Sequence, residues 1–303
     1  MENQLLAALG YPPDARLVIF HADDVGMCHG SNQAFFDLVP AGLVQSGSVM
    51  IPCPWSPELL TACRTNPNYD LGVHLTLTSE WAGYRWGPLT TRDPVSGLLD
   101  SEGYFWPSTV HLRVGIDVAA AEIELRGQIE TGWRAGLDFT HFDTHMGAAL
   151  LPELLSVYLE LGFAYEVPVL LPRYIDDYVR SLGLPMPDEA TYQAIVEGVT
   201  ERGMPLVDWF RITPGYDGSD SEGGRRALYE QMLVTLPAGV TFVSLHPNAP
   251  GDIEHIVPDK AHWRTFEYEL FQSDWLRGLL QREQIVPIGF RALRTVMRNT
   301  MRR

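Results

Sequence analysis

The sequence predicts an α/β barrel, because short apolar runs alternate with longer amphipathic segments along the whole chain. The apolar runs are rich in β-branched residues, which is typical of buried strands in a largely parallel sheet. The chain has 303 residues, of which 46% are hydrophobic and 20% charged, and this allows a substantial core. Neither an internal repeat nor a linker composition divides it. We therefore expect a single domain over residues 1–303.

About eight runs qualify as strands, a number that favours a barrel with a mostly parallel sheet. They are residues 16–21, 46–51, 71–77, 139–142, 167–171, 205–209, 241–245 and 285–288. Between them, apolar residues recur at three- and four-residue spacing, as in helices that cover a sheet. These helical segments are residues 117–135, 151–161, 188–202, 221–236 and 259–284.

Residues 79–107 show no clear period and are dense in glycine, proline and aromatic side chains. The aromatic residues are Trp81, Tyr84, Trp86, Tyr104, Phe105 and Trp106. Long segments without secondary structure are uncommon inside compact domains and often carry function. We expect a long functional loop or lid here.

The formal net charge of −16 disfavours sequence-independent binding to nucleic acid or anionic lipid, because both need clustered cations. A sugar or another uncharged metabolite fits this charge better. Three cysteines are too few for a disulfide framework and suit a reducing compartment. The first 15 residues lack signal-peptide features, and no apolar stretch reaches about 18 residues. We expect a cytoplasmic protein without a membrane partner, and a homo-oligomer is compatible with the sequence.

Two adjacent carboxylates, Asp23 and Asp24, follow the first apolar run and are the most informative feature of the chain. Strand ends of this kind carry the chemistry of α/β enzymes. Neighbouring carboxylates repel and are costly to desolvate, so a fold places them together chiefly where a cation or a shared proton compensates. A helix N-cap is the alternative for one of them. We expect one to ligate a metal and the other to act as a base.

Histidines stand at or near the ends of other predicted strands. His74 interrupts the apolar run 71–77, where a satisfied core residue is the alternative. His141, Asp143 and His145 alternate along an extended segment and could therefore share one face. A metal-ligating imidazole usually donates its second N–H to an acceptor, so one of these three can bind while another orients it.

His246 closes the predicted strand 241–245 and precedes a proline. In a closed barrel the last strands lie beside the first, so His246 could face the two aspartates and serve as a general acid. Asp24, His74 and His145 together offer one oxygen and two nitrogen ligands. That set suits zinc, and also nickel, cobalt or manganese, whereas magnesium usually prefers more oxygen. With positions left open, bound water could become a nucleophile and Asp23 could take its proton.

As a group, these motifs resemble those of the YdjC-like carbohydrate deacetylases, which are related to the polysaccharide deacetylases. Four segments carry the resemblance, which extends from about residue 17 to residue 288. They are residues 22–26 (ADDVG), 72–75 (GVHL), 140–145 (THFDTH) and 246–247 (HP). Leu171-Pro172-Arg173 agrees with an arginine that the family often has after a strand.

The resemblance implies a distorted (β/α) barrel with one divalent metal ion, zinc or magnesium, held by Asp24, His74 and His145. It implies that Asp23 is the catalytic base and that His246 gives a proton to the leaving amine. Arg173 would hold Asp23 or the substrate, and His141 and Asp143 would contact the substrate or support the ligands. The reaction implied is hydrolysis of an N-acetyl group on a small amino sugar or oligosaccharide. The aromatic segment 79–107 could then offer flat faces to sugar rings, with ordinary loop packing as the alternative.

Two positions depart from the family pattern. Gly147 stands where the family commonly has another histidine, and Val25 replaces a phenylalanine beside the acids. Both changes concern the substrate pocket more than the metal. Two other functions stay open: metal-dependent phosphoester hydrolysis on the same barrel, and a non-catalytic carbohydrate-binding relative.

Overall fold

A curled, parallel β-sheet forms the centre of the molecule in the computed structural model, which describes residues 4–183, 187–212 and 221–302. Seven strands make up the sheet, in the order β4-β3-β2-β1-β6-β5, with β7 paired to β1. They are β1 (Arg16–Val25), β2 (Ser46–Val49), β3 (Leu71–Leu75), β4 (Phe142–Thr144), β5 (Trp209–Ile212), β6 (Gly239–Leu245) and β7 (Ile285–Pro287). All pairings between these strands are parallel. The predicted α/β class and distorted (β/α) barrel are confirmed, with the sheet closing only half of a barrel.

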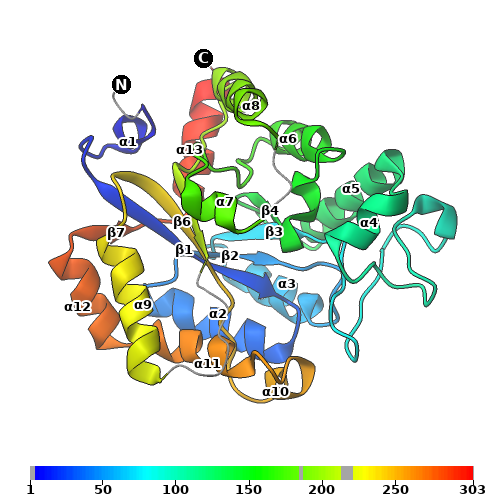
Figure 1. Ribbon diagram of the computed structural model, residues 1–303, viewed down its shortest axis with the longest axis horizontal. Helices are drawn as coiled ribbons and strands as arrows, with labels where there is room; N and C mark the ends of the chain where they lie inside the picture. The colour runs from blue at the N-terminus through cyan, green and yellow to red at the C-terminus, as the bar shows by residue number, and fades with distance from the viewer. Residues whose placement is uncertain (1–3, 184–186, 213–220, 303) are drawn as a thin grey trace.

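Helices surround the sheet, with α6, α8 and α13 on one side and α2, α10 and α11 on the other (Figure 1). The helices before the long loop are α1 (Gln4–Leu9), α2 (His29–Ala41) and α3 (Ser56–Thr65). Within the loop lies η1 (Pro94–Ser96). After it come α4 (Thr109–Gly115), α5 (Val118–Arg134), η2 (His145–Leu150), α6 (Leu155–Ala164), α7 (Asp177–Ser181) and α8 (Glu189–Glu201). The last are α9 (Glu222–Val234), α10 (Ile253–Ile256), α11 (Ala261–Leu270), α12 (Asp274–Arg282) and α13 (Phe290–Met301). In the described part of the chain, no helix is both long and apolar enough to span a membrane.

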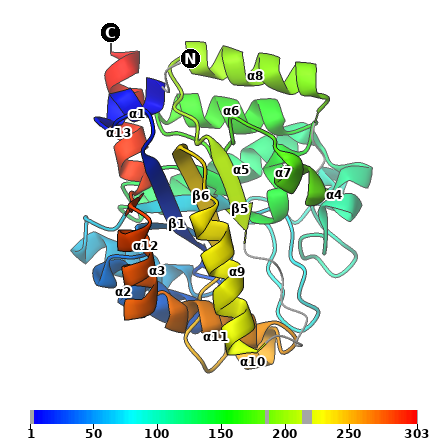
Figure 2. The ribbon, with the colours of Figure 1, turned by 60° about the vertical axis from the view of Figure 1, so that its left-hand side comes forward.

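β1 divides two hydrophobic clusters, because successive side chains of a strand point to opposite faces. Leu17 and Ile19 belong to a smaller cluster with Phe242 and Phe290. The residues between them, such as Val18, pack into the large cluster under the helices. Figure 2 shows β1, β6 and β5 side by side with α9 in front of them. The alternation places His21 and Asp23 on the same face of β1 as Leu17.

The predicted strand at 167–171 is wrong as a strand of the sheet. It is reduced to an isolated bridge between Phe142 and Val169. Pro168 interrupts this segment and Pro172 follows it, and proline cannot donate the N–H that a ladder requires. The sheet therefore stops short of closure at this point.

Other predicted boundaries also shift. The strand expected at 139–142 is β4 at Phe142–Thr144. The strand expected at 205–209 begins only at Trp209, because Asp208 bonds Val240 through its side chain as well as its backbone. The single helix expected at 259–284 is two helices, α11 and α12. Ser273 separates them, since its hydroxyl caps α12 by accepting a hydrogen bond from the N–H of Leu276.

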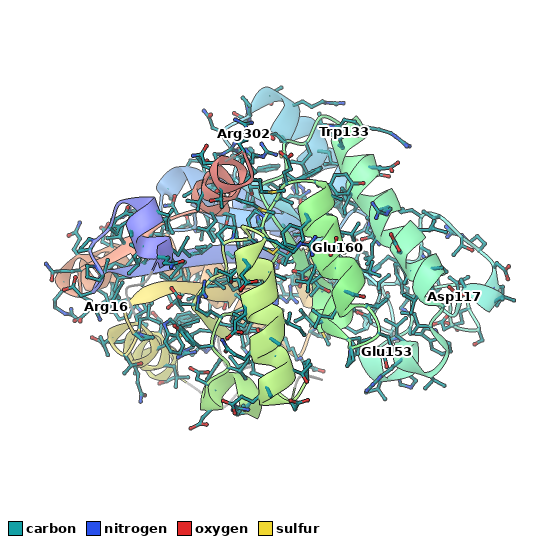
Figure 3. The ribbon with its side chains drawn as sticks, turned by 90° about the horizontal axis from the view of Figure 1, so that it is seen from above. Arg16, Asp117, Trp133, Glu153, Glu160 and Arg302 are labelled. Atoms are coloured by element: carbon teal, nitrogen blue, oxygen red, sulfur yellow. The ribbon has the colours of Figure 1, made fainter. Side chains whose placement is uncertain are left out.

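The outer helices carry many of the charged residues, as expected from the composition. In Figure 3, Asp117 and Trp133 mark the two ends of α5, and Glu160 lies on the neighbouring α6. Most of the ion pairs on these helices are exposed, such as Arg202 with Glu160, where about half of each side chain is accessible. Exposed pairs of this kind contribute little to stability. The charges that matter for chemistry lie at the end of the sheet.

Candidate metal centre

The end of β1 is distorted in a way that brings both aspartates to one place. Residues 22 and 25 pair with Gly47 and Val49 of β2, so Asp23 and Asp24 together stand opposite the single Ser48. This extra residue is a β-bulge. Asp24 has φ of 60°, a left-handed conformation that is rare outside glycine. Regular alternation would point the two carboxylates to opposite faces, and the bulge removes that separation.

Asp24, His74 and His145 form a buried group at the C-terminal ends of β1, β3 and β4. Oδ1 of Asp24 lies 3.2 Å from Nδ1 of His145 and 3.6 Å from Nε2 of His74. The three ligand-type atoms all lie within 4.8 Å of one another. Each residue is at most 3% exposed. The structure therefore unites the three residues that the sequence predicted as metal ligands.

A test on Asp24 shows that this group suits a cation. Its Oδ1 atom is buried and accepts no hydrogen bond from the described residues. A buried carboxylate oxygen that accepts no hydrogen bond is costly, and a bound cation reduces that cost. One oxygen and two imidazole nitrogens form a donor set that divalent transition metals accept. The residues present thus fit a divalent metal ion.

In His74 and His145, the ring nitrogen that points away from Asp24 contacts a carboxylate. Nδ1 of His74 lies 2.9 Å from Oδ2 of Asp143, and Nε2 of His145 lies 2.9 Å from Oε2 of Glu80. Ser48 donates a hydrogen bond of 2.8 Å to the same oxygen of Asp143. Such partners fix the tautomer and orientation of metal-ligating histidines. Nε2 of His74 and Nδ1 of His145 are left facing Asp24.

Two of the candidate ligands, Asp24 and His145, favour opposite charges. Burial works against ionisation of Asp24, but the guanidinium of Arg264 and the imidazole of His145 hold its pKa well below the usual range. Burial likewise opposes protonation of His145, yet Glu80 and Asp24 raise its pKa to about 10. Both shifts favour the charged forms, so binding of a metal ion by these two groups would release the proton of His145.

Arg264 pairs with the other oxygen of Asp24. Its Nη2 atom lies 2.9 Å from Oδ2, and the side chain is only 4% exposed. Nε and Nη1 of this guanidinium have no hydrogen-bond partner among the described residues. Trp81 lies 6.0 Å from the guanidinium carbon, measured to the ring centroid. Arg264 leaves Asp24 with a single oxygen for the candidate cation.

Asp23 stands beside this group without belonging to it. Its Oδ1 atom lies 2.5 Å from Nδ1 of His21, and Ser244 donates a hydrogen bond of 2.6 Å to Oδ2. Nε2 of His246 is 3.9 Å from the same Oδ2. Both oxygens of the carboxylate are thereby oriented. Asp23 and His246 face each other, as the sequence predicted for a base and an acid.

His246 is held from behind by Glu267, whose Oε2 accepts the His246 backbone N–H at 2.5 Å. The ring of Trp263 lies 5.1 Å from the imidazole. Burial is the main cause that lowers the pKa of His246 to about 4. The side chain is therefore neutral near pH 7, and it must receive a proton before it can act as an acid.

The three residues expected to contact the substrate or support the ligands have different positions. Asp143 supports His74, as described above. His141 is fully buried and stacks on Phe290, with ring centroids 3.9 Å apart. Arg173 was expected to hold Asp23 or the substrate, but its Nε lies 3.5 Å from Asp208. His21 and Ser244 hold Asp23 instead, and a substrate contact by Arg173 stays a prediction.

A second group of ligand-type atoms, from His21, His141 and Asp143, also lies within 4.8 Å. The Nε2 atoms of the two histidines are 2.8 Å apart and share a hydrogen bond. This bond satisfies both nitrogens, so the group requires no ion.

The aromatic segment 79–107 is packed more closely than a mobile lid would be. Trp86 and Phe105 are buried, with 3% and 0% of their surface exposed. The Trp86 indole donates to the carbonyl of Thr78, and its ring centroid lies 5.9 Å from that of His145. Trp81 differs, because its indole N–H finds no partner in the described part of the chain. Core packing explains the buried rings, of which Trp86 also contacts His145, and Trp81 lies beside the site near Arg264.

Sequence reasoning missed Glu80, Arg264, Ser48 and Ser244, which support the site but show no local signal. Glu80 follows β3 in a loop, and Arg264 lies in the middle of an amphipathic helix. Each of these four side chains contacts a site residue that is distant in the sequence. Only the tertiary arrangement reveals them.

These features define a class: an α/β half-barrel with a candidate Asp-His-His metal centre and a separate, oriented carboxylate at the C-terminal end of its sheet. The sequence profile of the YdjC-like protein family matches residues 17–282. The chain belongs to this family, as its motifs predicted.

Two named relatives and one solved structure are similar to this chain over much of its length. A Thermus thermophilus protein named carbohydrate deacetylase is 30% identical over 282 residues, which are 93% of this chain and 95% of the relative. A Thermoanaerobacter pseudethanolicus protein of the same name is 28% identical over 189 residues, or 62% of this chain and 74% of the relative. Among solved structures, a putative cellobiose-phosphate cleavage protein from Enterococcus faecalis superposes with a TM-score of 0.74 at 22% identity. The superposition covers 92% of this chain and 99% of that one, and it supports the fold.

Proposed function

We propose that this protein is a metal-dependent deacetylase that hydrolyses the N-acetyl group of a small amino sugar or oligosaccharide. One observation carries the proposal: Asp24, His74 and His145 surround a point where a cation fits, and Asp23 lies beside them with both oxygens oriented. The name carbohydrate deacetylase, given to relatives over most of this chain, supports the substrate class. Zinc suits the donor set best, and magnesium is the alternative.

The metal ion, when bound, would polarise the acetyl carbonyl and lower the pKa of the attacking water. Asp23 accepts a proton from that water as its oxygen bonds to the acetyl carbon. The proton then reaches the departing amine when the C–N bond breaks, leaving acetate and a free amino sugar. Nε2 of His246 lies 3.9 Å from Oδ2 of Asp23, so His246 can take this proton and pass it on. Because His246 is neutral before the reaction, it acts as a relay.

The order of these proton movements follows from the environments of the two groups. Ser244 donates a hydrogen bond to Oδ2 of Asp23, and Nδ1 of His21 lies 2.5 Å from Oδ1, so both oxygens of the proposed base are fixed in place. His246 has its pKa lowered to about 4, mainly by burial, so it gives up a proton readily once it has one. An acid of this strength protonates an amine leaving group at little cost.

An acetate-release assay tests the proposal. The purified protein is stripped with a chelator, reloaded separately with zinc, magnesium, manganese, cobalt or nickel, and offered acetylated amino sugars and chitooligosaccharides. Both acetate and free amine should appear in equal amounts. Phosphate release from sugar phosphates, without acetate release, would instead support phosphoester hydrolysis. Carbohydrate binding without any turnover would support the non-catalytic alternative.

Three variants separate metal binding from chemistry. Asp24→Ala and His145→Ala should lose both metal binding and turnover. Asp23→Asn should keep the metal and lose turnover by a factor of about 100 or more, because only the base is removed. Glu130→Gln, in an exposed ion pair on α5, is the control for a lost surface carboxylate. Full activity in Asp24→Ala would refute the metal assignment.

A further inference from the structure

An open cavity lies at the end of the sheet opposite to the candidate metal centre. Its volume is about 480 Å³, within the range of roughly 300 to 1,000 Å³ that is typical of small-ligand sites. The C-terminal ends of α5, α6 and α13 border it, together with residues 136–139, which lead into β4. The candidate metal ligands lie at the other ends of the strands. The proposed reaction uses no residue of this cavity.

Aromatic rings form one part of the cavity wall. Trp133 lies in the last turn of α5 (Figure 3) and is 64% exposed, whereas the large ring of a tryptophan is mostly buried in folded proteins. Phe139 is buried and Tyr165 is half-buried, and their ring centroids are 5.8 Å apart. Gly136 and Ala164 also line the cavity, and their small size leaves room beside the rings. The cavity thus combines an accessible indole with two packed rings.

Two charged side chains of the lining, Arg298 and Glu166, have no side-chain partner. Nε of Arg298 donates a hydrogen bond of 3.2 Å to the backbone carbonyl of Glu166. Within the described part of the chain, neither Nη1 and Nη2 of Arg298 nor the exposed carboxylate of Glu166 takes part in a hydrogen bond or an ion pair. Asp138, the other acid of the lining, differs because Arg294 pairs with it at 2.6 Å. The cavity therefore offers one free donor group and one free acceptor group.

A ligand of this cavity has to match an apolar face and two opposite charges. An anion would be attracted by Arg298 but repelled by Glu166, and a cation would meet the reverse. A wholly apolar ligand would remove water from both charged groups without replacing their hydrogen bonds, which is costly. A sugar ring avoids these costs, because its hydroxyl groups both donate and accept and its C–H face can pack on an indole.

We propose that this cavity is a second carbohydrate-binding site, in which a neutral pyranose ring packs on Trp133. Its hydroxyl groups accept hydrogen bonds from Nη1 and Nη2 of Arg298 and donate to the carboxylate of Glu166. The inference goes beyond the proposed deacetylation, because the cavity and the candidate metal centre share no residue. Binding at this site is therefore expected without turnover.

Nitrogen-15 NMR of the tryptophan indole groups tests the proposal on the intact protein. The indole N–H signal of Trp133 is the one that disappears in Trp133→Phe. Triacetylchitotriose and cellotriose are added separately to the unaltered protein, and at least one of them should shift this signal until it saturates. Because the cavity is open and offers few polar groups, we expect a dissociation constant on the order of 1 mM. No saturable shift with either sugar overturns the proposal.

Variants of the lining residues are followed through the backbone N–H signal of Gly136, which lies in the cavity wall. Trp133→Ala should weaken sugar binding about tenfold or more, because the apolar face is lost. Arg298→Ala should weaken it about fivefold, the effect of one lost hydrogen bond. Arg282→Ala, which removes an exposed guanidinium on α12, is the control and should bind the sugar as the unaltered protein does. Equal affinities in all three variants would contradict the proposed contacts.

Adenine and inorganic phosphate represent the alternative ligands. Adenine offers a flat aromatic ring without hydroxyl groups, and phosphate offers negative charge without an apolar face. Both should shift the Trp133 signal less than the sugars do. A saturable shift with adenine or phosphate, and with neither sugar, would replace the proposal with an aromatic or anionic ligand.

Failure of the deacetylase proposal would be recognised separately. Treatment with a chelator should abolish acetate release and leave the sugar-induced shift of the Trp133 signal unchanged. Conversely, Trp133→Ala should keep the acetate release of the unaltered protein. Loss of acetate release in Trp133→Ala, or loss of the shift on chelation, would contradict two independent sites.

Discussion

Oε2 of Glu80 lies 2.9 Å from Nε2 of His145, and this contact decides which nitrogen of the imidazole faces Asp24. The same relation holds between Asp143 and His74 on the other side of the candidate centre. A carboxylate thus contacts each of the two histidines on the side away from Asp24, and Arg264 forms an ion pair with Asp24. Neighbouring side chains thus orient all three candidate ligands.

Removing the support behind His145 should weaken metal binding. Glu80→Ala should raise the dissociation constant for zinc by a factor of about 10 to 100, because the imidazole loses its orientation and basicity. Glu80→Gln should have a smaller effect, since its amide oxygen can still accept the N–H. Isothermal titration calorimetry measures both, with Glu130→Gln as the control. Unchanged affinity in Glu80→Ala would show that the contact is incidental.

Arg264 should contribute most to the unfolding free energy when the protein is metal-free. Arg264→Gln leaves the buried carboxylate of Asp24 without its cation, so the metal-free protein should lose about 3 kcal/mol of unfolding free energy. Saturating zinc should reduce this deficit, because the ion supplies the missing charge. Denaturant unfolding with and without a chelator measures the difference. Arg134→Gln, in an exposed pair on α5, should change the unfolding free energy very little. An Arg264→Gln deficit that is the same with and without metal would contradict this explanation.

His246 should make the protein sensitive to mild acid. Its pKa in the folded state is about 4, below the ordinary 6.5, so between these values the unfolded chain binds a proton that the folded one does not. This contribution to stability is complete above about pH 6.5 and is lost as the pH falls toward 4, by an amount on the order of 3 kcal/mol. His246→Gln cannot titrate and should lose less stability over that interval. His29→Gln, at a half-exposed position, is the control, and parallel curves for His246→Gln and the unaltered protein would refute the assignment.

Gly72 should tolerate no side chain. A Cβ there would lie 2.6 Å from the backbone oxygen of His141 as well as from its ring, so the strands would have to separate. Gly72→Ala should therefore cost about 1 to 3 kcal/mol of unfolding free energy or more. Gly198→Ala, in α8 with open space around it, should instead be neutral or stabilising by up to about 1 kcal/mol. Thermal unfolding compares the two, and similar melting temperatures would argue against the tight contact at Gly72.

The candidate metal ligands could be singled out from the sequence because their signal is local. Asp24, His74 and His145 each interrupt or end an apolar run, and parallel strands bring such ends to one edge of a sheet. The α/β class followed in the same way from alternating runs. The strand predicted at 167–171 was wrong because Pro168 removes a ladder donor within an otherwise apolar run.

The supports of the site could not be predicted, because each depends on a contact between distant residues. Arg264 meets Asp24 across 240 positions of the chain, and Ser244 meets Asp23 across 221. The bulge at Asp23 and Asp24 depends on the register with β2, which the sequence of β1 alone does not contain.

By itself, the sequence determined the kinds of side chain available at the ends of the strands and the class of fold that gathers them. The tertiary structure alone decided which atoms meet: one oxygen of Asp24 directed to the candidate cation, the other to Arg264, and the oxygens of Asp23 to Ser244 and His21. The physical reason is that apolar periodicity sets each element locally, whereas the directions of buried polar groups are set by partners that only folding brings within hydrogen-bond distance.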